Sequence, residues 1–285
     1  MTVAPPPGRH GGDGARLAAA LGIDPADVLD LSASLNPVAP DPSPAIARHL
    51  DAIGRYPDPS RATAALADAM EVDPDRLLLT NGGSEAIALV AAELGGHVIG
   101  PEFSLYERHF DQSRPGGRWR SNPHNPTGIL AGPDETASVW DEAFWPLATG
   151  TWTRGDDVVL GSLTKLLACP GLRIGYVLAA DPTLIKRLAA LQPQWSLNGL
   201  AASALPDLLA TVDLPGWAKA TADLRHDLAR LLQEHGFASW PSEANWLLVH
   251  APDLREHLAD HAILVRDCTS FGMAGVVRIA VPDEA

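Results

Sequence analysis

The residues of this sequence best suited to chemistry lie in SLTKLLACPGLRIGY, residues 162–176. Lys165 follows a serine and a threonine and precedes an apolar segment, so we expect its ammonium group to be partly desolvated. Desolvation lowers the pKa of a lysine, and a neutral amine is the nucleophile that Schiff-base chemistry needs. A lysine at a strand end whose ammonium reaches solvent would give the same pattern, so the residue types alone leave both interpretations open.

Three further charged residues lie in apolar surroundings. Arg173 in GLRIG and Arg278 in VVRIA are placed beside strand-like residues, where a guanidinium needs either a salt bridge or a bound anion. Asp141 in WDEAF lies between apolar and aromatic neighbours, where a carboxylate usually has a cationic partner. A solvated strand end is the alternative interpretation of Asp141.

Two loop motifs could hold a ligand. TNGGSEAI, residues 80–87, places glycines between a predicted strand and a predicted helix, where backbone N–H groups and the helix dipole favour a phosphate. It lacks the lysine of a P-loop and the spacing of a dinucleotide site, and an ordinary tight turn explains it equally well. SNPHNPTG, residues 121–128, has two Asn-Pro steps that restrict the backbone and could present Asn125 rigidly, although a plain loop is the alternative.

The elements that must position these residues alternate between strands and helices. Short apolar runs followed by helical spacing of apolar residues occur at 75–94 and 158–191, and HVIG at 97–100 predicts another short strand. This alternation indicates an α/β fold with a largely parallel sheet covered on both faces. After about residue 215 a long helix leads into short strands, which predicts a smaller α+β domain.

Composition narrows the functional classes. The 285 residues carry a formal net charge of −14, which argues against a nucleic-acid or anionic-membrane surface, so an anionic ligand must be bound by a few placed cations. Cys169 and Cys268 are too few for a disulfide framework and indicate a reducing cytoplasm. The N-terminus has no apolar leader, no segment reaches the roughly 18 apolar residues of a membrane span, and the histidines show no metal-ligand spacing.

In their order along the chain, these motifs resemble those of fold-type I pyridoxal-phosphate enzymes, in the branch with histidinol-phosphate aminotransferase and threonine-phosphate decarboxylase. The resemblance extends from RHGGD to RIAVPDEA. It implies a large domain with a mostly parallel sheet flanked by helices, a smaller α+β C-terminal domain, a pyridoxal 5'-phosphate cofactor and a homodimer. The domains expected are an N-terminal arm that contributes to the small domain (1–40), a large cofactor-binding domain (41–212) and a small C-terminal domain (213–285).

The resemblance also implies roles around the cofactor ring. Lys165 in SLTK corresponds to the lysine that holds the cofactor, and Asp141 in DEAF to the aspartate that keeps the pyridine nitrogen protonated. Asn125 in NPTG corresponds to the asparagine bonded to the ring 3-oxygen. Tyr106 in PEFSLY corresponds to the aromatic residue stacked on the ring face.

The remaining implied contacts are to anionic groups. Arg278 corresponds to the arginine that binds the substrate α-carboxylate, and Arg266 in LVRDC is a second anion contact. His10 and Asn36 are expected to help hold a substrate phosphate. The residues implied for the cofactor phosphate are Gly83, Ser84, Ser162, Arg173 and, reaching across from the neighbouring subunit, Tyr56.

Three segments point to one reaction within this branch. RHGGD, LDLSASLNP and QPQWSLNGLA resemble the threonine-phosphate decarboxylase side, which implies decarboxylation of L-threonine O-3-phosphate to aminopropanol phosphate in cobalamin biosynthesis. An aminotransferase for histidinol phosphate or another amino acid is the alternative, and a compacted relative that binds a ligand without catalysis is a third hypothesis. The segment between Tyr106 and Asn122 is shorter than the family's, which predicts a trimmed sheet.

Overall fold

A computed structural model of the chain describes residues 4–155 and 157–283. Its largest sheet is built from five strands, which are β2 (Leu77–Asn81), β3 (Trp119–Ser121), β4 (Val139–Asp141), β5 (Val158–Gly161) and β6 (Ile174–Ala179). The strands lie in the order β2-β6-β5-β4-β3. Strand β6 runs antiparallel to both of its neighbours, and the other four strands share one direction. The predicted mostly parallel sheet is therefore confirmed.

Side chains of this sheet form two apolar layers, because successive residues of a strand point to opposite faces. In β5, Val158 and Leu160 pack into one layer and Val159 packs into the other. Both faces are thus buried, as the continuous apolar sequences of the strands predicted. The covering helices are α4 (Gly82–Leu94) and α8 (Pro182–Leu191) on the first layer, and α3 (Ser60–Met70) and α9 (Gly199–Leu209) on the second.

A second, smaller lobe is built from both ends of the chain. Strand β10 (Val276–Ala280) lies between β7 (Trp246–His250) and β9 (Arg266–Asp267) and pairs antiparallel with both. Strand β1 (Leu29–Asp30) pairs in parallel with β8 (Ile263–Leu264). The N-terminal segment therefore belongs structurally to the C-terminal lobe, while the domain limits at residues 40 and 212 stay predictions.

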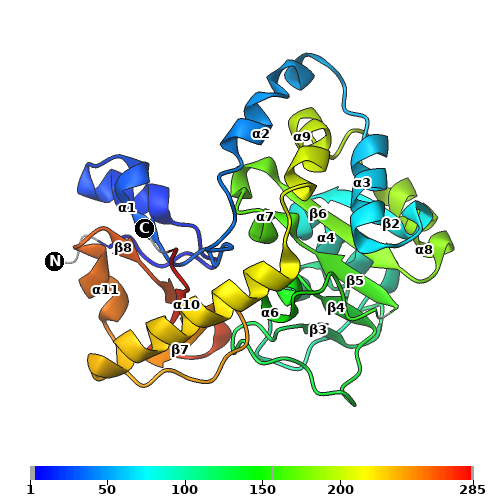
Figure 1. Ribbon diagram of the computed structural model, residues 1–285. Coiled ribbons are helices and arrows are strands. Elements are labelled where there is room, and N and C mark those ends of the chain that lie inside the picture. Colours follow the sequence, from blue (N-terminus) through cyan, green and yellow to red (C-terminus); the bar gives the residue numbers. More distant parts are fainter. Residues whose placement is uncertain (1–3, 156, 284–285) are drawn as a thin grey trace.

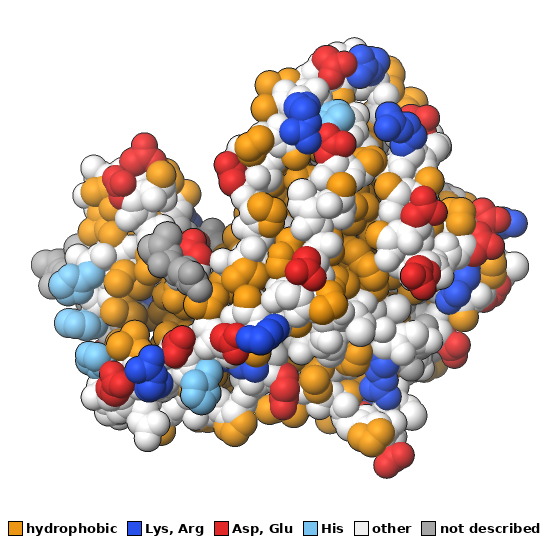
Figure 2. Space-filling model, in the orientation of Figure 1, with side chains coloured by type: hydrophobic (Ala, Val, Ile, Leu, Met, Phe, Trp, Pro, Cys, Tyr) orange, Lys and Arg blue, Asp and Glu red, His pale blue; other side chains and the backbone are white. Residues whose placement is uncertain are grey.

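Helix α10 (Leu214–Glu234) connects the two lobes and crosses from one to the other in Figure 1. Trp217 packs into the core of the large sheet, and Leu228 packs into the core of the small lobe. Figure 2 shows a wide notch between the lobe that carries α1 (Gly14–Leu21) and the helix α2 (Ser43–Ala47), with hydrophobic side chains along its floor. The other short helices are α5 (Leu105–His109), α6 (Trp145–Thr149), α7 (Leu163–Leu166) and α11 (Leu254–Ala259).

The strand predicted at 97–100 does not form. His97 makes a single parallel bridge to Arg118, with its N–H bonded to Gly117 and its carbonyl bonded to Trp119. The prediction failed because Pro101 cannot donate a backbone hydrogen bond and the neighbouring strand β3 has only three residues to offer as partners. At this edge of the sheet, the Trp119 indole of β3 donates instead to the Gly95 carbonyl at 3.0 Å.

The described part of the chain shows no membrane-crossing element. None of the helices within residues 4–155 and 157–283 is both long enough and apolar enough to cross a bilayer. Over the same residues, no group of His, Cys, Asp and Glu side chains is arranged to hold a metal ion. Cys169 and Cys268 are both buried as free thiols.

Candidate functional site

The candidate site lies where parallel strands of the large sheet end. Strand β4 ends at Asp141, and β5, paired with it through Asp141 and Leu160, ends at Gly161 and leads into α7 with Lys165. Strand β2 ends at Asn81 and leads directly into α4. Because parallel strands present their carboxyl ends at one edge, the fold brings these segments together where ligands usually bind in α/β proteins.

Lys165 is held by the N-terminal segment. Its Nζ donates to the Ala33 carbonyl at 2.8 Å, while the Asn36 N–H donates to the Lys165 carbonyl at 3.0 Å. Desolvation lowers the pKa of Lys165 to about 8, and repulsion from three cationic neighbours acts in the same direction. Those neighbours are Arg278, Arg173 and Arg266. The amine can therefore shed its proton close to neutral pH, as Schiff-base chemistry requires.

The three arginines near Lys165 have no carboxylate partner within the residues that the structure describes. Their hydrogen-bond acceptors are neutral oxygens: the Pro170 carbonyl for Arg173, the Arg9 carbonyl and Ser270 hydroxyl for Arg266, and the Asn125 amide for Arg278. Burial lowers the pKa of Arg278 to about 9 and lowers that of Arg266 as well. Clustered guanidinium groups without carboxylates make a site for anionic ligands.

Asp141 is a desolvated carboxylate with neutral partners. Its Oδ2 accepts the hydroxyl of Tyr106 at 2.7 Å, and its Oδ1 accepts the Ala143 N–H at 3.0 Å. Desolvation raises the pKa of Asp141, and these two hydrogen bonds oppose the rise. A carboxylate in this state favours a cationic N–H donor, because such a donor offsets the cost of burying its charge.

Tyr106→Phe tests the Tyr106 contact with Asp141. Removing the hydroxyl leaves Asp141 Oδ2 without its donor, so we expect the free energy of unfolding to fall by about 1–3 kcal/mol. Urea unfolding of the ligand-free protein followed by circular dichroism measures the change. Tyr56→Phe is the control, since Tyr56 is 79% exposed. Equal stability of Tyr106→Phe and the wild type would contradict the importance of this bond.

The start of α4 forms a cradle that only glycine allows. A Cβ at Gly82 would lie 2.4 Å from the Arg173 guanidinium, and one at Gly175 in β6 would lie 2.6 Å from the Gly83 backbone nitrogen. The Ser162 side chain lies beside Gly83. Helix α4 has no side-chain cap at its first turn, so the N–H groups of Gly83 and Ser84 face outward with the positive end of the helix dipole. Together with Arg173, this arrangement suits a phosphate.

Asn125 and Arg278 are joined across the two lobes. Arg278 donates to Asn125 Oδ1 at 2.8 Å, and its guanidinium lies over the Trp246 ring at 4.8 Å from the centroid. Since Asn125 Oδ1 is occupied, the Nδ2 of Asn125 is the group that can donate to a ligand. The Nε of Arg278 is buried without a partner, which leaves this arginine with unused donor capacity.

The N-terminal arm brings His10 to the same region. Its ring lies edge-on to Phe103 at 5.2 Å, and Phe103 lies edge-on to Tyr106 at 5.7 Å. Desolvation lowers the pKa of His10, with Arg266 as the largest electrostatic contributor. His10 Nδ1 and Arg266 Nε are both buried without a hydrogen-bond partner. His10 and Arg266 thus present two buried nitrogen atoms that a bound ligand would satisfy, that of Arg266 being a donor.

Three predicted residues are placed differently from the expected contacts. Asn36 has its Nδ2 bonded to the Leu166 carbonyl and its Oδ1 bonded to the Val38 N–H, so its amide secures α7. Tyr56 stacks on Trp195 at the surface, with centroids 4.5 Å apart. Tyr106 has no exposed surface, so its ring presents no open face in this structure, and its contact with Asp141 is made by the hydroxyl.

Several residues of the site were missed by the sequence reasoning. Trp246 lies under Arg278, and Asn245 donates to the carbonyls of Ser34 and Leu35, next to the carbonyl that binds Lys165. Glu102 is buried, and its carboxylate accepts hydrogen bonds from the Ser121 backbone N–H and hydroxyl. These residues lie in the segments PEFSLY and EANW. No sequence spacing distinguishes a tryptophan or glutamate that supports a site from one that packs in the core or lies in solvent.

Comparison with known proteins places the chain in a family. The model of the family "Aminotransferase class I and II" matches residues 106–285. The chain is 33% identical to the threonine-phosphate decarboxylase of Salmonella typhimurium over 324 aligned residues, with 92% of this chain and 88% of that protein covered. It is 28% identical to the histidinol-phosphate aminotransferase of Halorubrum lacusprofundi, with 91% of this chain and 86% of that protein covered.

Solved structures share the architecture. The crystal structure of histidinol-phosphate aminotransferase from Sinorhizobium meliloti in complex with pyridoxal-5'-phosphate matches with a TM-score of 0.78 at 18% identity, covering 95% of this chain and 90% of that one. At that identity the match shows the fold alone. Because the family model spans more than half of the chain and a relative above 30% identity aligns over most of both lengths, this protein belongs to the class I and II aminotransferase family of enzymes.

Proposed function

We propose that the chain is a pyridoxal 5'-phosphate (PLP) enzyme that decarboxylates L-threonine O-3-phosphate to aminopropanol phosphate, as a step of cobalamin biosynthesis. The observation that carries this proposal is the grouping of Arg173, Arg266 and Arg278 near Lys165, without carboxylate partners in the described part of the chain. Such a group can neutralise several anionic groups at once. The 33% identity to a threonine-phosphate decarboxylase supports the choice of substrate.

The residues present fit PLP. The glycine cradle at the start of α4, with Ser162 and Arg173, suits the cofactor phosphate. Asp141 suits the protonated ring nitrogen, since its present partners are a neutral hydroxyl and a backbone N–H. Asn125 Nδ2 suits the ring 3-oxygen. When bound, PLP supplies an electron sink for the bond that breaks at the substrate Cα.

Lys165 is proposed to hold the cofactor and to move protons. Its lowered pKa makes the neutral amine available as a nucleophile, and the Ala33 carbonyl fixes the position of Nζ. With the cofactor bound, the Lys165 amine would also be the group that holds or delivers a proton at the substrate Cα. Tyr56, on the surface beside Trp195, is proposed to reach the cofactor phosphate of a second subunit in a homodimer.

The charges of the substrate match the remaining cations. Threonine phosphate carries an α-carboxylate and a phosphate, and both need donors besides those that hold the cofactor. Arg278 is proposed to bind the carboxylate, and Arg266 with His10 the phosphate, because each has a buried nitrogen atom without a partner. Asn36 contributes by securing α7, on which Lys165 lies, rather than through a free side-chain donor.

The rate of PLP attachment to the ligand-free protein is expected to rise with pH through about 8. The neutral amine is the reactive form, so the rate follows deprotonation of Lys165. Arg278→Gln removes the cationic neighbour with the largest effect and should move the midpoint upward. Stopped-flow absorbance across the pH range measures both midpoints. A wild-type midpoint at the ordinary lysine value of 10.5 would contradict a desolvated Lys165.

An assay with two substrates tests the proposal. The protein loaded with PLP is incubated with threonine phosphate in the absence of any keto acid, and CO₂ release is measured; release supports the decarboxylase. A parallel reaction contains histidinol phosphate and 2-oxoglutarate, and formation of glutamate is measured. The second reaction represents the alternative function, which the likeness to histidinol-phosphate aminotransferases supports. Activity only in the second reaction would overturn the proposed decarboxylase.

A further inference from the structure

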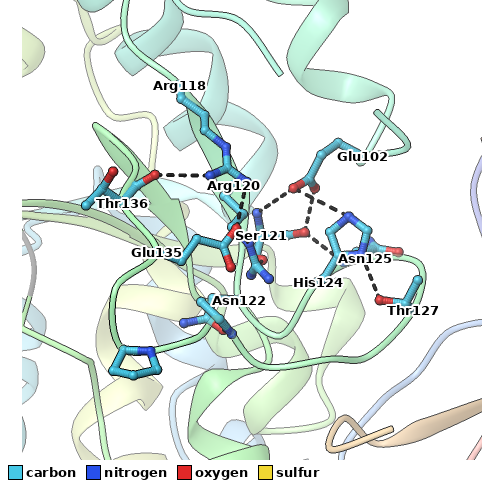
Figure 3. A network of polar contacts seen from close by, with 12 residues as sticks. Glu102, Arg118, Arg120, Ser121, Asn122, His124, Asn125, Thr127, Glu135 and Thr136 are labelled. Atoms are coloured by element: carbon cyan, nitrogen blue, oxygen red, sulfur yellow. Dashed lines mark hydrogen bonds and ion pairs between the residues drawn. The ribbon is translucent and has the colours of Figure 1, made fainter. Parts of the chain in front are cut away.

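Glu102 is a buried carboxylate that the proposed function leaves unassigned. It is 9% exposed and lies in the loop before α5. Its Oε1 accepts the backbone N–H of Ser121 at 3.1 Å, and its Oε2 accepts the Ser121 hydroxyl at 2.5 Å. Figure 3 shows Glu102 and Ser121 facing each other, with Asn125 on the other side of the serine. A carboxylate this deeply buried is costly, so its two bonds to a single serine indicate a specific role.

Ser121 links Glu102 to the groups proposed to contact PLP. Its Oγ accepts the backbone N–H of Asn125 at 2.7 Å, which anchors the residue whose Oδ1 binds Arg278. The hydroxyl of Tyr106, the donor to Asp141, is also a hydrogen-bond neighbour of Ser121. A serine hydroxyl has one proton and two lone pairs, so it can donate one hydrogen bond and accept two. The neighbour to which Ser121 donates therefore determines which other neighbours can donate to Ser121.

Two arrangements of this hydrogen-bond chain follow. When Glu102 is ionised, the Ser121 proton points to Glu102, and Ser121 gives no proton to Tyr106. When Glu102 is protonated, its own proton points to Ser121, whose hydroxyl then turns to donate to Tyr106. Tyr106 donates to Asp141 in both arrangements, but it is a stronger donor when it receives a hydrogen bond itself. The charge on Glu102 therefore changes how firmly Asp141 is bound by the protein.

We infer that Glu102 is a positioning residue which, through the Ser121 hydroxyl, sets the hydrogen bonding of Asn125 and Asp141 and so tunes how this site binds PLP. This inference rests on the proposed function, because it assigns Asn125 and Asp141 to the cofactor. Glu102 acts only through Ser121 and Tyr106.

His124 encloses the carboxylate from the loop side. Its Nε2 lies 2.8 Å from the Pro101 carbonyl, and its Nδ1 lies 2.7 Å from the Thr127 hydroxyl. A carbonyl only accepts, so Nε2 carries the proton and Nδ1 accepts from Thr127. Desolvation lowers the pKa of His124, so this ring stays neutral and its Nε2, 3.8 Å from Glu102, does not neutralise the carboxylate.

The charged groups around Glu102 allow both arrangements near neutral pH. Burial raises the pKa of Glu102 to about 7 against the lowering effect of the Ser121 bonds. Asp141 raises that pKa further, and Arg120 lowers it. Burial also raises the pKa of the Tyr106 hydroxyl, which therefore keeps its proton throughout this range.

Glu102→Gln tests the inference, because glutamine has the shape of glutamate and donates to Ser121 as the protonated acid does. PLP affinity of the ligand-free protein is measured by fluorescence titration at about pH 8.5 and about pH 5.5, on either side of the Glu102 transition. At the higher pH we expect PLP binding about two- to fourfold weaker than in the wild type, because one hydrogen bond to a charged group becomes stronger by up to about 30%. At the lower pH the two proteins should bind equally, because the wild-type Glu102 is then protonated.

Glu107→Gln is the matched control, since Glu107 is an exposed carboxylate five positions along the same segment, and its affinity should equal that of the wild type at both pH values. Ser121→Ala keeps the Glu102 charge and breaks the link, so adding Glu102→Gln to Ser121→Ala should leave the PLP affinity unchanged at both pH values. Circular dichroism confirms that each variant folds. If Glu102→Gln does not fold, the ratio of the Ser121→Ala affinity to the wild-type affinity decides the question: it should differ between the two pH values, and an equal ratio would overturn the inference.

The outcomes separate the two proposals. A loss of PLP affinity in Glu102→Gln that disappears at low pH supports the role of Glu102, and a loss of equal size at both pH values assigns it to packing alone and overturns the inference. Unchanged affinity at the higher pH also overturns it. A wild-type protein that binds no PLP would refute the proposed function and this inference together, whereas wild-type binding with an unaffected Glu102→Gln variant would refute the inference alone.

Discussion

Lys165→Ala is expected to lower the rate of threonine-phosphate decarboxylation by about 10³-fold or more, in the upper part of the range for lost proton transfer. The substitution removes both the nucleophile proposed to hold PLP and the amine proposed to protonate Cα. The ligand-free variant should fold as well as the wild type, because the change removes a desolvated cation that faces three arginines. The measurements are CO₂ release under single-turnover conditions and the visible absorbance of the PLP-loaded protein.

Lys186→Ala is the matched control for this experiment. Lys186 is an exposed lysine in α8, away from the arginine group, and its removal should leave both the rate and the spectrum unchanged. A Lys165→Ala protein that retains the wild-type visible band and rate would show that another amine holds the cofactor, or that none does.

Asp141→Asn is expected to reduce the rate by about 10²–10³-fold, the usual effect of removing one electrostatic contact at a developing charge. Asparagine keeps the shape of the side chain but has no negative charge to keep the pyridine nitrogen protonated. Stability should change little, because the variant loses one hydrogen-bond acceptor and also loses a desolvated charge whose pKa burial raises. Rates with saturating PLP and urea unfolding of the ligand-free protein measure the two effects.

Asp134→Asn is the matched control for Asp141→Asn. Asp134 is an exposed aspartate in the loop before β4, and its substitution changes the formal charge by the same amount. Its rate should equal that of the wild type. If Asp141→Asn also kept the wild-type rate, Asp141 would not be the partner of the ring nitrogen, and the function of this edge of the sheet would have to be assigned anew.

The arginines illustrate how far sequence reasoning reaches. A guanidinium in an apolar strand context requires an anion, and this physical requirement identified Arg173 and Arg278 as ligand-binding candidates before any contact was known. The structure shows both arginines bonded to neutral oxygens. What the requirement left open was the choice between a salt bridge and a ligand. Only the surroundings of each arginine in the fold decide that choice.

Tyr106 illustrates where sequence reasoning stopped. The motif PEFSLY predicted that Tyr106 lies in the site. The contact of its hydroxyl with Asp141, however, depends on how α5 packs against β3 and β4. His97 makes only a single bridge to Arg118, and the rings of Tyr106 and Phe110 pack against Trp119 of β3. Packing of this kind depends on contacts between residues far apart in the sequence, which local sequence patterns do not encode.

By itself the sequence determined the alternation of strands and helices, the glycine turn before α4 and the apolar setting of Lys165. These features depend on local periodicity and on the chemistry of single side chains. Only the tertiary structure decided that Lys165 binds a carbonyl 132 positions away, that Arg278 meets Asn125 across 153 positions and that Arg266 reaches the arm at Arg9 across 257. Contacts at such separations follow from how lobes and layers pack, and the burial and charge that shift each pKa follow from the same packing.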